Sequence, residues 1–154
     1  MVNNRISLET IPMPLLEGMM KIEHYLKNCG VDRKLLELVK YRVSQINGCG
    51  YCLDMHHKEA ILLGESEQRL HGLAAWRESP YYSPTERDVL AYAEVLTLTQ
   101  GHAVEDSLFE SLRAYFSLEE VIVLTLAITQ INSWNRISKA FGSVPGSYEA
   151  KKSE

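Results

Sequence analysis

The chain has 154 residues, of which 45% are hydrophobic and 23% charged, which is typical of a single globular domain with a sizeable core. The formal net charge of −4 gives no basic surface, so we expect no nucleic-acid partner. No apolar run approaches the roughly 20 residues of a membrane helix. Residues 1–5 also lack the apolar core of a secretion signal, and we therefore predict a cytoplasmic protein with no membrane contact.

The apolar spacing and the helix start and stop signals predict an all-α fold of six or seven helices. Residues 1–14 are expected to form an extended arm, because Pro12 and Pro14 oppose a helix. Residues 15–142 then form one helical domain, followed by a polar tail over residues 143–154, of which we expect residues 147–154 to fray. The expected helices cover about 15–29, 33–46, 49–63, 67–79, 84–98, 105–115 and 118–141.

The clearest boundaries are two stretches with a serine cap followed three residues later by glutamate, Ser83–Glu86 and Ser117–Glu120. In the last predicted helix, residues 121–131 are apolar nearly all round. We expect this segment to be buried on several sides or to lie at a subunit interface.

The chemically richest stretch begins after the Asn47-Gly48 turn signal and contains Cys49, Cys52 and His56. In a helix starting near Cys49, these three side chains fall within roughly 60° of one face. A helix N-terminus and a nearby histidine both favour the thiolate, which is the reactive form of cysteine. Two cysteines one helical turn apart also lie within the Cα separation that a disulfide requires. The pattern indicates redox chemistry.

The two thiols are not equivalent. The helix dipole favours Cys49, which is usually the more exposed position of such a pair, as the attacking thiol. A nearby base favours Cys52 as the attacking thiol, because His56 lies roughly 6 Å along the helix axis from Cys52 and roughly 10 Å from Cys49. We predict that Cys52 attacks a peroxide and that Cys49 resolves the product, whereas a thioredoxin-like exchange protein would reverse the order.

Other interpretations of these residues remain open. Cys49, Cys52, His56 and a carboxylate could form a zinc site, although a second C-x-x-C or an H-x-x-x-H pattern is absent from the sequence. The cysteines could also be inert core residues, which is the interpretation we favour for Cys29. We predict no metal and no cofactor.

The spacing of Glu37, eleven residues and then C-x-x-C-x-x-x-H resembles the alkylhydroperoxidase D (AhpD)-like branch of the carboxymuconolactone decarboxylase family. Residues 46–56, 73–78 and 131–136 are similar to short members of that branch, and the likeness spans about residues 10–142. Decarboxylase members of the family lack the cysteine pair, which argues against lactone decarboxylation. One departure is Tyr51, which stands where long members have a histidine and cannot take up a proton near neutral pH.

The resemblance implies a helical fold that assembles as a homotrimer or homohexamer. It also implies a peroxidase cycle in which Cys52 is peroxidatic, Cys49 is resolving, and Glu37 and His56 form a proton relay. The implied partners are a hydroperoxide substrate and a dithiol reductant, either a lipoyl-type or a thioredoxin-like protein. From the residues alone, Glu37 could shuttle a proton or simply pair with a lysine such as Lys40.

Three further polar residues, Asn132, Asn135 and Arg136, share one face of the last predicted helix. They could line the site or clasp a neighbouring subunit, and we favour a structural or interface role. His102, in a predicted loop, could reach the site, but we expect it to be exposed. Alternative functions are a disulfide oxidoreductase with weak peroxidase activity and a redox-sensing oligomer.

Overall fold

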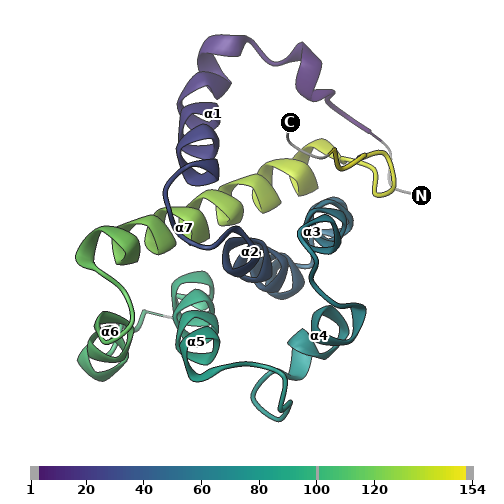
Figure 1. Cartoon of the computed structure of the whole chain (residues 1–154). Coiled ribbons are helices and arrows are strands. Elements are labelled where there is room, and N and C mark those ends of the chain that lie inside the picture. The colour runs from purple at the N-terminus through teal and green to yellow at the C-terminus, as the bar shows by residue number, and fades with distance from the viewer. Residues whose placement is uncertain (1–3, 100, 152–154) are drawn as a thin grey trace.

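The computed structural model describes residues 4–99 and 101–151, which form seven α-helices, two short 3-10 turns and no strand (Figure 1). The helices are α1 (Met13–Lys27), α2 (Arg33–Asn47), α3 (Gly50–Leu62), α4 (Glu67–Gly72), α5 (Pro84–Leu98), α6 (Asp106–Arg113) and α7 (Leu118–Phe141). The 3-10 turns are Leu8–Thr10 and Leu73–Ala75. The prediction of an all-α fold is confirmed, and each predicted helix is present.

Helix α2 lies at the centre of the molecule and packs against α3, α5 and α7 (Figure 1). Its apolar side chains recur at helical spacing, and Val39 and Val43 are completely buried. The long α7 crosses the same layer and also contacts α1. Because α2 touches three helices at once, residues on its different faces are brought to different parts of the protein.

Two apolar clusters stabilise this arrangement. The larger one joins α1, α2, α3, α5, α6 and α7, and it includes Cys49 and Cys52. The smaller one lies where α2, α3, α4 and α5 meet, and Trp76 and Tyr82 belong to it. The cysteine pair is therefore fixed by packing in the main core.

The boundary between α2 and α3 has a specific physical cause. Gly48 ends α2 with φ at +60°, in the left-handed region where a side chain would be strained. Cys49 is then extended and caps α3, as its sulfur accepts from the backbone N–H of Cys52 at 3.4 Å. The capping boxes predicted at Ser83 and Ser117 are also present.

The expectations for the two ends of the chain need correction. Helix α1 begins at Met13, so Pro14 lies in its first turn, where the missing N–H has no partner to lose. The tail has contacts with α3 that the expected fraying did not include. Gly146 donates its N–H to Asp54 at 3.0 Å, and Lys58 donates to the carbonyl of Tyr148 at 2.8 Å. Residues 1–3 and 152–154 lie outside the described part, and the domain limits at 15 and 142 stay a prediction.

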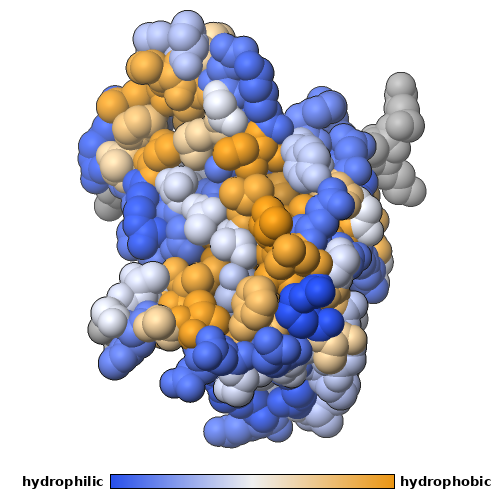
Figure 2. Space-filling view, turned by 90° about the vertical axis from the view of Figure 1, so that its left-hand side faces the viewer, coloured by the Kyte–Doolittle hydropathy of each residue, from blue (hydrophilic) through white to orange (hydrophobic). Residues whose placement is uncertain are grey.

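Part of the apolar surface stays on the outside of the chain. Figure 2 shows hydrophobic surface running from the top of this face to its middle, at the heights that α1 and α7 occupy in Figure 1. The exposed apolar side chains of these two helices are Met13, Leu15, Met20, Tyr25, Leu118, Ile122 and Leu126. The predicted burial of α7 on several sides is thus confirmed for most of its apolar middle, with Ile122 and Leu126 left exposed.

Within the described residues, no single helix has the length and apolarity needed to cross a membrane. The pair α6 and α7 passes that test only when taken together, with a bend of 119° between the two helices.

Candidate active site

Cys49 and Cys52 form a disulfide, with their Cα atoms 5.4 Å apart. Both residues are buried, at 1% and 3% exposure. The expectation that Cys49 is the more exposed thiol is therefore wrong, because its position as the cap of α3 turns it into the main core. Oxidation across this pair is compatible with the helical backbone, as the spacing predicted.

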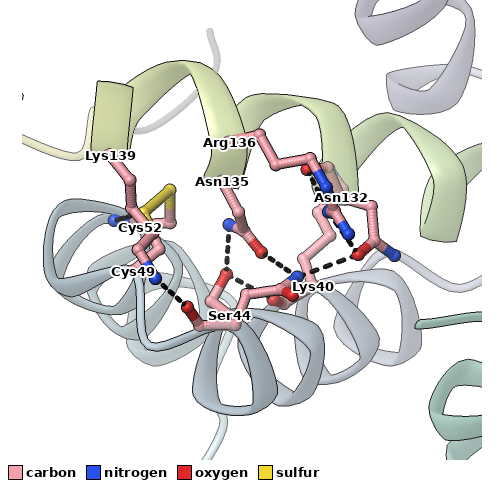
Figure 3. Close-up of a disulfide and its surroundings, with 9 residues drawn as sticks. Lys40, Ser44, Cys49, Cys52, Asn132, Asn135, Arg136 and Lys139 are labelled. Carbon is pink, nitrogen blue, oxygen red and sulfur yellow. Dashed lines mark hydrogen bonds between the residues drawn. A yellow bond between two sulfur atoms is a disulfide. The ribbon is translucent and has the colours of Figure 1, made fainter. Parts of the chain in front are cut away.

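The turn that carries Cys49 is held by α7. The side-chain amide of Asn47 donates to Asn132 at 2.9 Å and to Asn135 at 2.8 Å, while Asn135 donates to the Ser44 hydroxyl at 3.0 Å. The backbone N–H of Cys49 in turn donates to the Ser44 carbonyl at 3.1 Å. Figure 3 shows these α7 side chains directed at the α2–α3 turn beside the disulfide. The asparagines thus have the structural role that the sequence favoured, within a single chain.

Glu37 on α2 meets His56 on α3. The His56 Nδ1 and Glu37 Oε2 atoms are 2.6 Å apart, and the other carboxylate oxygen accepts from Lys40 at 3.1 Å. Lys40 also lies 3.7 Å from Glu23 on α1, and Glu23 accepts from the indole of Trp134 on α7 at 2.8 Å. The expected pairing of Glu37 with Lys40 is present, and Glu37 also contacts His56, while its role in a proton relay stays a prediction.

Electrostatics fix the charge of Glu37. Burial by itself would raise the pKa of this carboxyl, but the charge of His56 and the hydrogen bond from it, followed by Lys40, lower the pKa to about 2. Burial would likewise lower the pKa of Lys40, yet Glu37 and Glu23 raise it. The carboxylate therefore accepts the Nδ1 proton of His56 and leaves Nε2 free for a second partner.

These residues face a cavity of about 280 Å³. Cys52, His56, Glu37, Lys40 and Tyr51 line it, whereas Cys49 does not. The rest of the lining is mainly apolar and comes from the N-terminal arm, α1, α2, α3, α7 and the tail, including Leu8, Met20, Leu36, Met55, Ile131, Trp134 and Tyr148. The two sulfurs are thus distinguished by their access to the cavity.

The C-terminal tail forms one wall of this cavity. The hydroxyl of Tyr148 donates to Glu59, and burial, together with Glu59, raises its pKa. Pro145 approaches Gly50 so closely that a Cβ on Gly50 would lie 3.1 Å from the proline ring. Sequence reasoning missed Tyr148, because a tyrosine in a polar tail carries no periodic signal.

Four other residues weighed from the sequence lie outside this constellation. His102 is exposed, as expected, and His57 lies 3.3 Å from Glu67. His71 is exposed, and Cys29 is a half-buried free thiol that packs against the main core. Among residues 4–99 and 101–151, no three or more His, Cys, Asp or Glu side chains are grouped so that they could hold a metal ion.

Comparison with known proteins identifies the family of this chain. The model of the carboxymuconolactone decarboxylase family matches residues 14–95, which include Glu37, Cys49, Cys52 and His56. The uncharacterized protein YdfG of Bacillus subtilis is 42% identical over 142 residues, or 92% of this chain and 97% of YdfG. The chain belongs to the carboxymuconolactone decarboxylase family.

Within the carboxymuconolactone decarboxylase family, the likeness points to AhpD-like members. A crystal structure of ATU0492 from Agrobacterium tumefaciens, described as a protein of unknown function and a candidate AhpD antioxidant defence protein, has a TM-score of 0.85 and 39% identity. It covers 92% of this chain and 97% of its own. The alkyl hydroperoxide reductase AhpD of Coxiella burnetii is 44% identical, but only over 43 residues, or 28% of this chain and 24% of AhpD.

The same fold also occurs in a protein named for other chemistry. The debrominase Bmp8 has a TM-score of 0.76 at 20% identity, covering 87% of this chain and 72% of its own. At that identity the likeness describes the fold alone, so the activity has to be argued from the site.

Proposed function

We propose that this protein is a thiol-dependent peroxidase that reduces organic hydroperoxides with Cys52 and Cys49 and is regenerated by an external dithiol. The observation that carries the proposal is that Cys52, and not Cys49, lines the cavity that His56 and Glu37 also line. Similarity to proteins named AhpD supports the same activity.

The first step takes place with both cysteines reduced. His56 accepts the thiol proton of Cys52 on Nε2, while Nδ1–H stays bound to Glu37. The Cys52 thiolate attacks the terminal oxygen of the hydroperoxide, the O–O bond breaks, and the sulfur becomes a sulfenic acid. The departing alkoxide takes the proton from His56 and leaves as the alcohol.

The second step closes the disulfide. The Cys49 sulfur attacks the sulfenic sulfur of Cys52, the S–O bond breaks, and water leaves. An external dithiol then reduces the disulfide by two successive exchanges and is itself oxidised to a disulfide. A lipoyl-type arm or a thioredoxin-like protein is the proposed donor, and a narrow dithiol arm suits a pair that is buried beneath the cavity.

Glu37 acts in this scheme as a fixed negative charge. With a pKa near 2 it stays ionised at neutral pH, so it orients His56 and stabilises the imidazolium without exchanging a proton itself. Lys40 holds the second carboxylate oxygen at 3.1 Å. Because Tyr51 stands where long members of the family have a histidine, the proposed scheme assigns the proton transfer at Cys52 to His56.

The assignment of the two thiols is tested by mass spectrometry after reaction with one equivalent of cumene hydroperoxide. Cys49→Ser should trap a sulfenic acid on Cys52 and complete one turnover, while Cys52→Ser should consume no peroxide. A sulfenic acid on Cys49 in the Cys52→Ser protein would reverse the assignment. Metal analysis of the purified protein tests the zinc alternative separately.

A disulfide oxidoreductase is the second candidate, and the observation that favours it is Tyr51 in place of a second base. Stopped-flow measurement of thiol loss separates the two functions. A peroxidase oxidises rapidly with hydroperoxide, whereas an oxidoreductase exchanges rapidly with dithiols and reacts slowly with peroxide.

For the assembly, we propose a homotrimer or homohexamer in the cytoplasm, where a thiol cycle can be kept reduced. The apolar residues exposed on α1 and α7 supply a surface of the kind that subunits cover. Light scattering should show a smaller particle for Ile122→Glu than for the native chain. An unchanged mass would place the contact elsewhere, and a redox-sensing oligomer would instead change mass on oxidation.

A further inference from the structure

Two cationic side chains at the cavity have no partner in the described residues. Most lysines and arginines donate to a carboxylate or a carbonyl, as Lys58, Arg69 and Lys139 do. Lys27 and Arg33 both line the cavity, yet neither has a hydrogen bond or an ion pair to residues 4–99 or 101–151. Their charges are unneutralised in a chain whose net charge is negative.

Three acids line the cavity, but in the described residues their hydrogen bonds and ion pairs go to other side chains than Lys27 and Arg33. Glu23 accepts from Trp134 and lies 3.7 Å from Lys40. Glu37 is shared between His56 and Lys40, and Glu59 accepts from Tyr148. Lys27 and Arg33 are therefore the two lining cations, among the described residues, that have no carboxylate partner within 4 Å, whereas Lys40 pairs with both Glu23 and Glu37.

The two cations are displaced from the redox centre. Arg33 is the first residue of α2 and lies one turn before Glu37, about 6 Å along the helix axis and on the same face. Lys27 is the last residue of α1. The same cavity is also lined by apolar side chains, including Leu26, Leu36 and Trp134.

Building on the proposed peroxidase, we infer that the cavity binds an organic hydroperoxide that carries a carboxylate at the end remote from the peroxide. Arg33 and Lys27 bind the carboxylate, and the apolar walls hold the hydrocarbon body. The hydroperoxide then lies at Cys52. A guanidinium suits this task because it can bind both carboxylate oxygens at once. The cavity, at about 280 Å³, suits a compact acid, since drug-sized ligands occupy roughly 300–1,000 Å³.

The kinetic test compares two substrates that differ only in charge: cumene hydroperoxide and its para-carboxylate, 4-(2-hydroperoxypropan-2-yl)benzoate. We expect the native protein to favour the carboxylate substrate by about tenfold in kcat/KM at low salt, because one charge-assisted hydrogen bond contributes a preference of about that size. This ratio should fall to about one in Arg33→Met/Lys27→Met and stay high in Arg33→Lys. Lys21→Met is the matched control, because Lys21 pairs with Glu17 elsewhere on α1.

A binding test keeps the inference separate from the peroxidase activity. The disulfide form is titrated with 4-isopropylbenzoate, which has the same body and carboxylate but no peroxide, and with 4-isopropylbenzamide as the neutral control. Saturable binding of the acid that weakens in Arg33→Met/Lys27→Met supports the subsite even if no peroxide is turned over. Equal binding of acid and amide, or a kinetic ratio unchanged by both substitutions, would overturn the subsite and leave the peroxidase standing.

Discussion

Glu37 and Glu94 are both buried carboxylates on inner helices, with side chains 12% and 10% exposed, and they differ in what surrounds them. Glu94 on α5 accepts two hydrogen bonds from Arg42, at 3.0 and 2.7 Å, and one from the Trp76 indole at 2.8 Å. It also accepts from Arg77. These donors are guanidinium and indole N–H groups, which donate hydrogen bonds and accept none.

The partners of Glu37 are of another kind. His56 is an imidazole, whose ring nitrogens can donate or accept a proton, and both residues line the cavity that Cys52 faces. The pKa of each carboxyl is lowered: burial opposes this at Glu94, while Trp76, Arg42 and Arg77 outweigh it. A lowered pKa therefore does not mark the active site by itself. The titratable partner and the access to a cavity make that distinction.

The largest expected effect is a loss of folding stability when Glu94 is replaced. Glu94→Ala leaves the half-buried Arg42 and the buried Trp76 indole without their acceptor, and removing one partner of a buried pair costs about 3–5 kcal/mol. Urea unfolding should show this loss, while the exposed Glu78→Ala should change little. The peroxide rate per folded molecule should stay near native. A folded, stable Glu94→Ala protein that has lost its thiol reactivity would give Glu94 a role in the chemistry.

A second prediction concerns Glu37, the carboxylate of the proposed mechanism. Glu37→Gln removes the charge that orients and stabilises His56, so oxidation of Cys52 by cumene hydroperoxide should slow about 100-fold, within the usual range for acid–base groups. Stopped-flow fluorescence of the reduced protein measures this step directly. Glu17→Gln, on the exposed face of α1, is the control. A native rate in Glu37→Gln would remove Glu37 from the mechanism.

The smallest expected effect is a change in the pH dependence of stability when Lys40, a partner of Glu37, is replaced. The folded pKa of Glu37, about 2, lies below its ordinary value of 4.5, so its ionisation stabilises the fold above about pH 4.5 and this contribution is lost as the pH falls toward 2. Lys40→Met removes one cause of that shift, so the loss should move to higher pH. Urea unfolding between pH 7 and pH 3 should show the displacement, by about one pH unit.

Lys40→Arg keeps the positive charge and serves as the matched control for this experiment. In Lys40→Met, the pH below which the peroxide rate falls should rise together with the pH at which stability is lost. In Lys40→Arg, both should stay near native. Coincident pH profiles for the native protein and Lys40→Met would show that Lys40 does not set the charge of Glu37.

Local sequence signals predicted the helices well, because caps, left-handed glycines and the 3.6-residue period act within a few residues. Ser83, Ser117 and Gly48 end or begin helices for reasons that are visible in the sequence itself. Pro14 was misjudged because a proline is tolerated in the first turn of a helix, and the sequence leaves the position of that turn uncertain by a few residues.

The constellation of Glu37, Cys49, Cys52 and His56 was also within reach of the sequence. Three of its members lie within eight residues, and the family pattern supplies Glu37 from the preceding helix. Tyr148 and the buried state of Lys40 were not within reach, because they depend on how α1, α7 and the tail close over α2 and α3. Such contacts join residues more than a hundred positions apart, as Trp134 and Glu23 do.

The sequence by itself therefore determined the helical elements and the cysteine spacing that permits the disulfide, since both rest on local spacing. Only the tertiary structure decided which sulfur faces the cavity. The cap position buries Cys49 in the core, and the first turn of α3 carries Cys52 to the cavity wall beside His56.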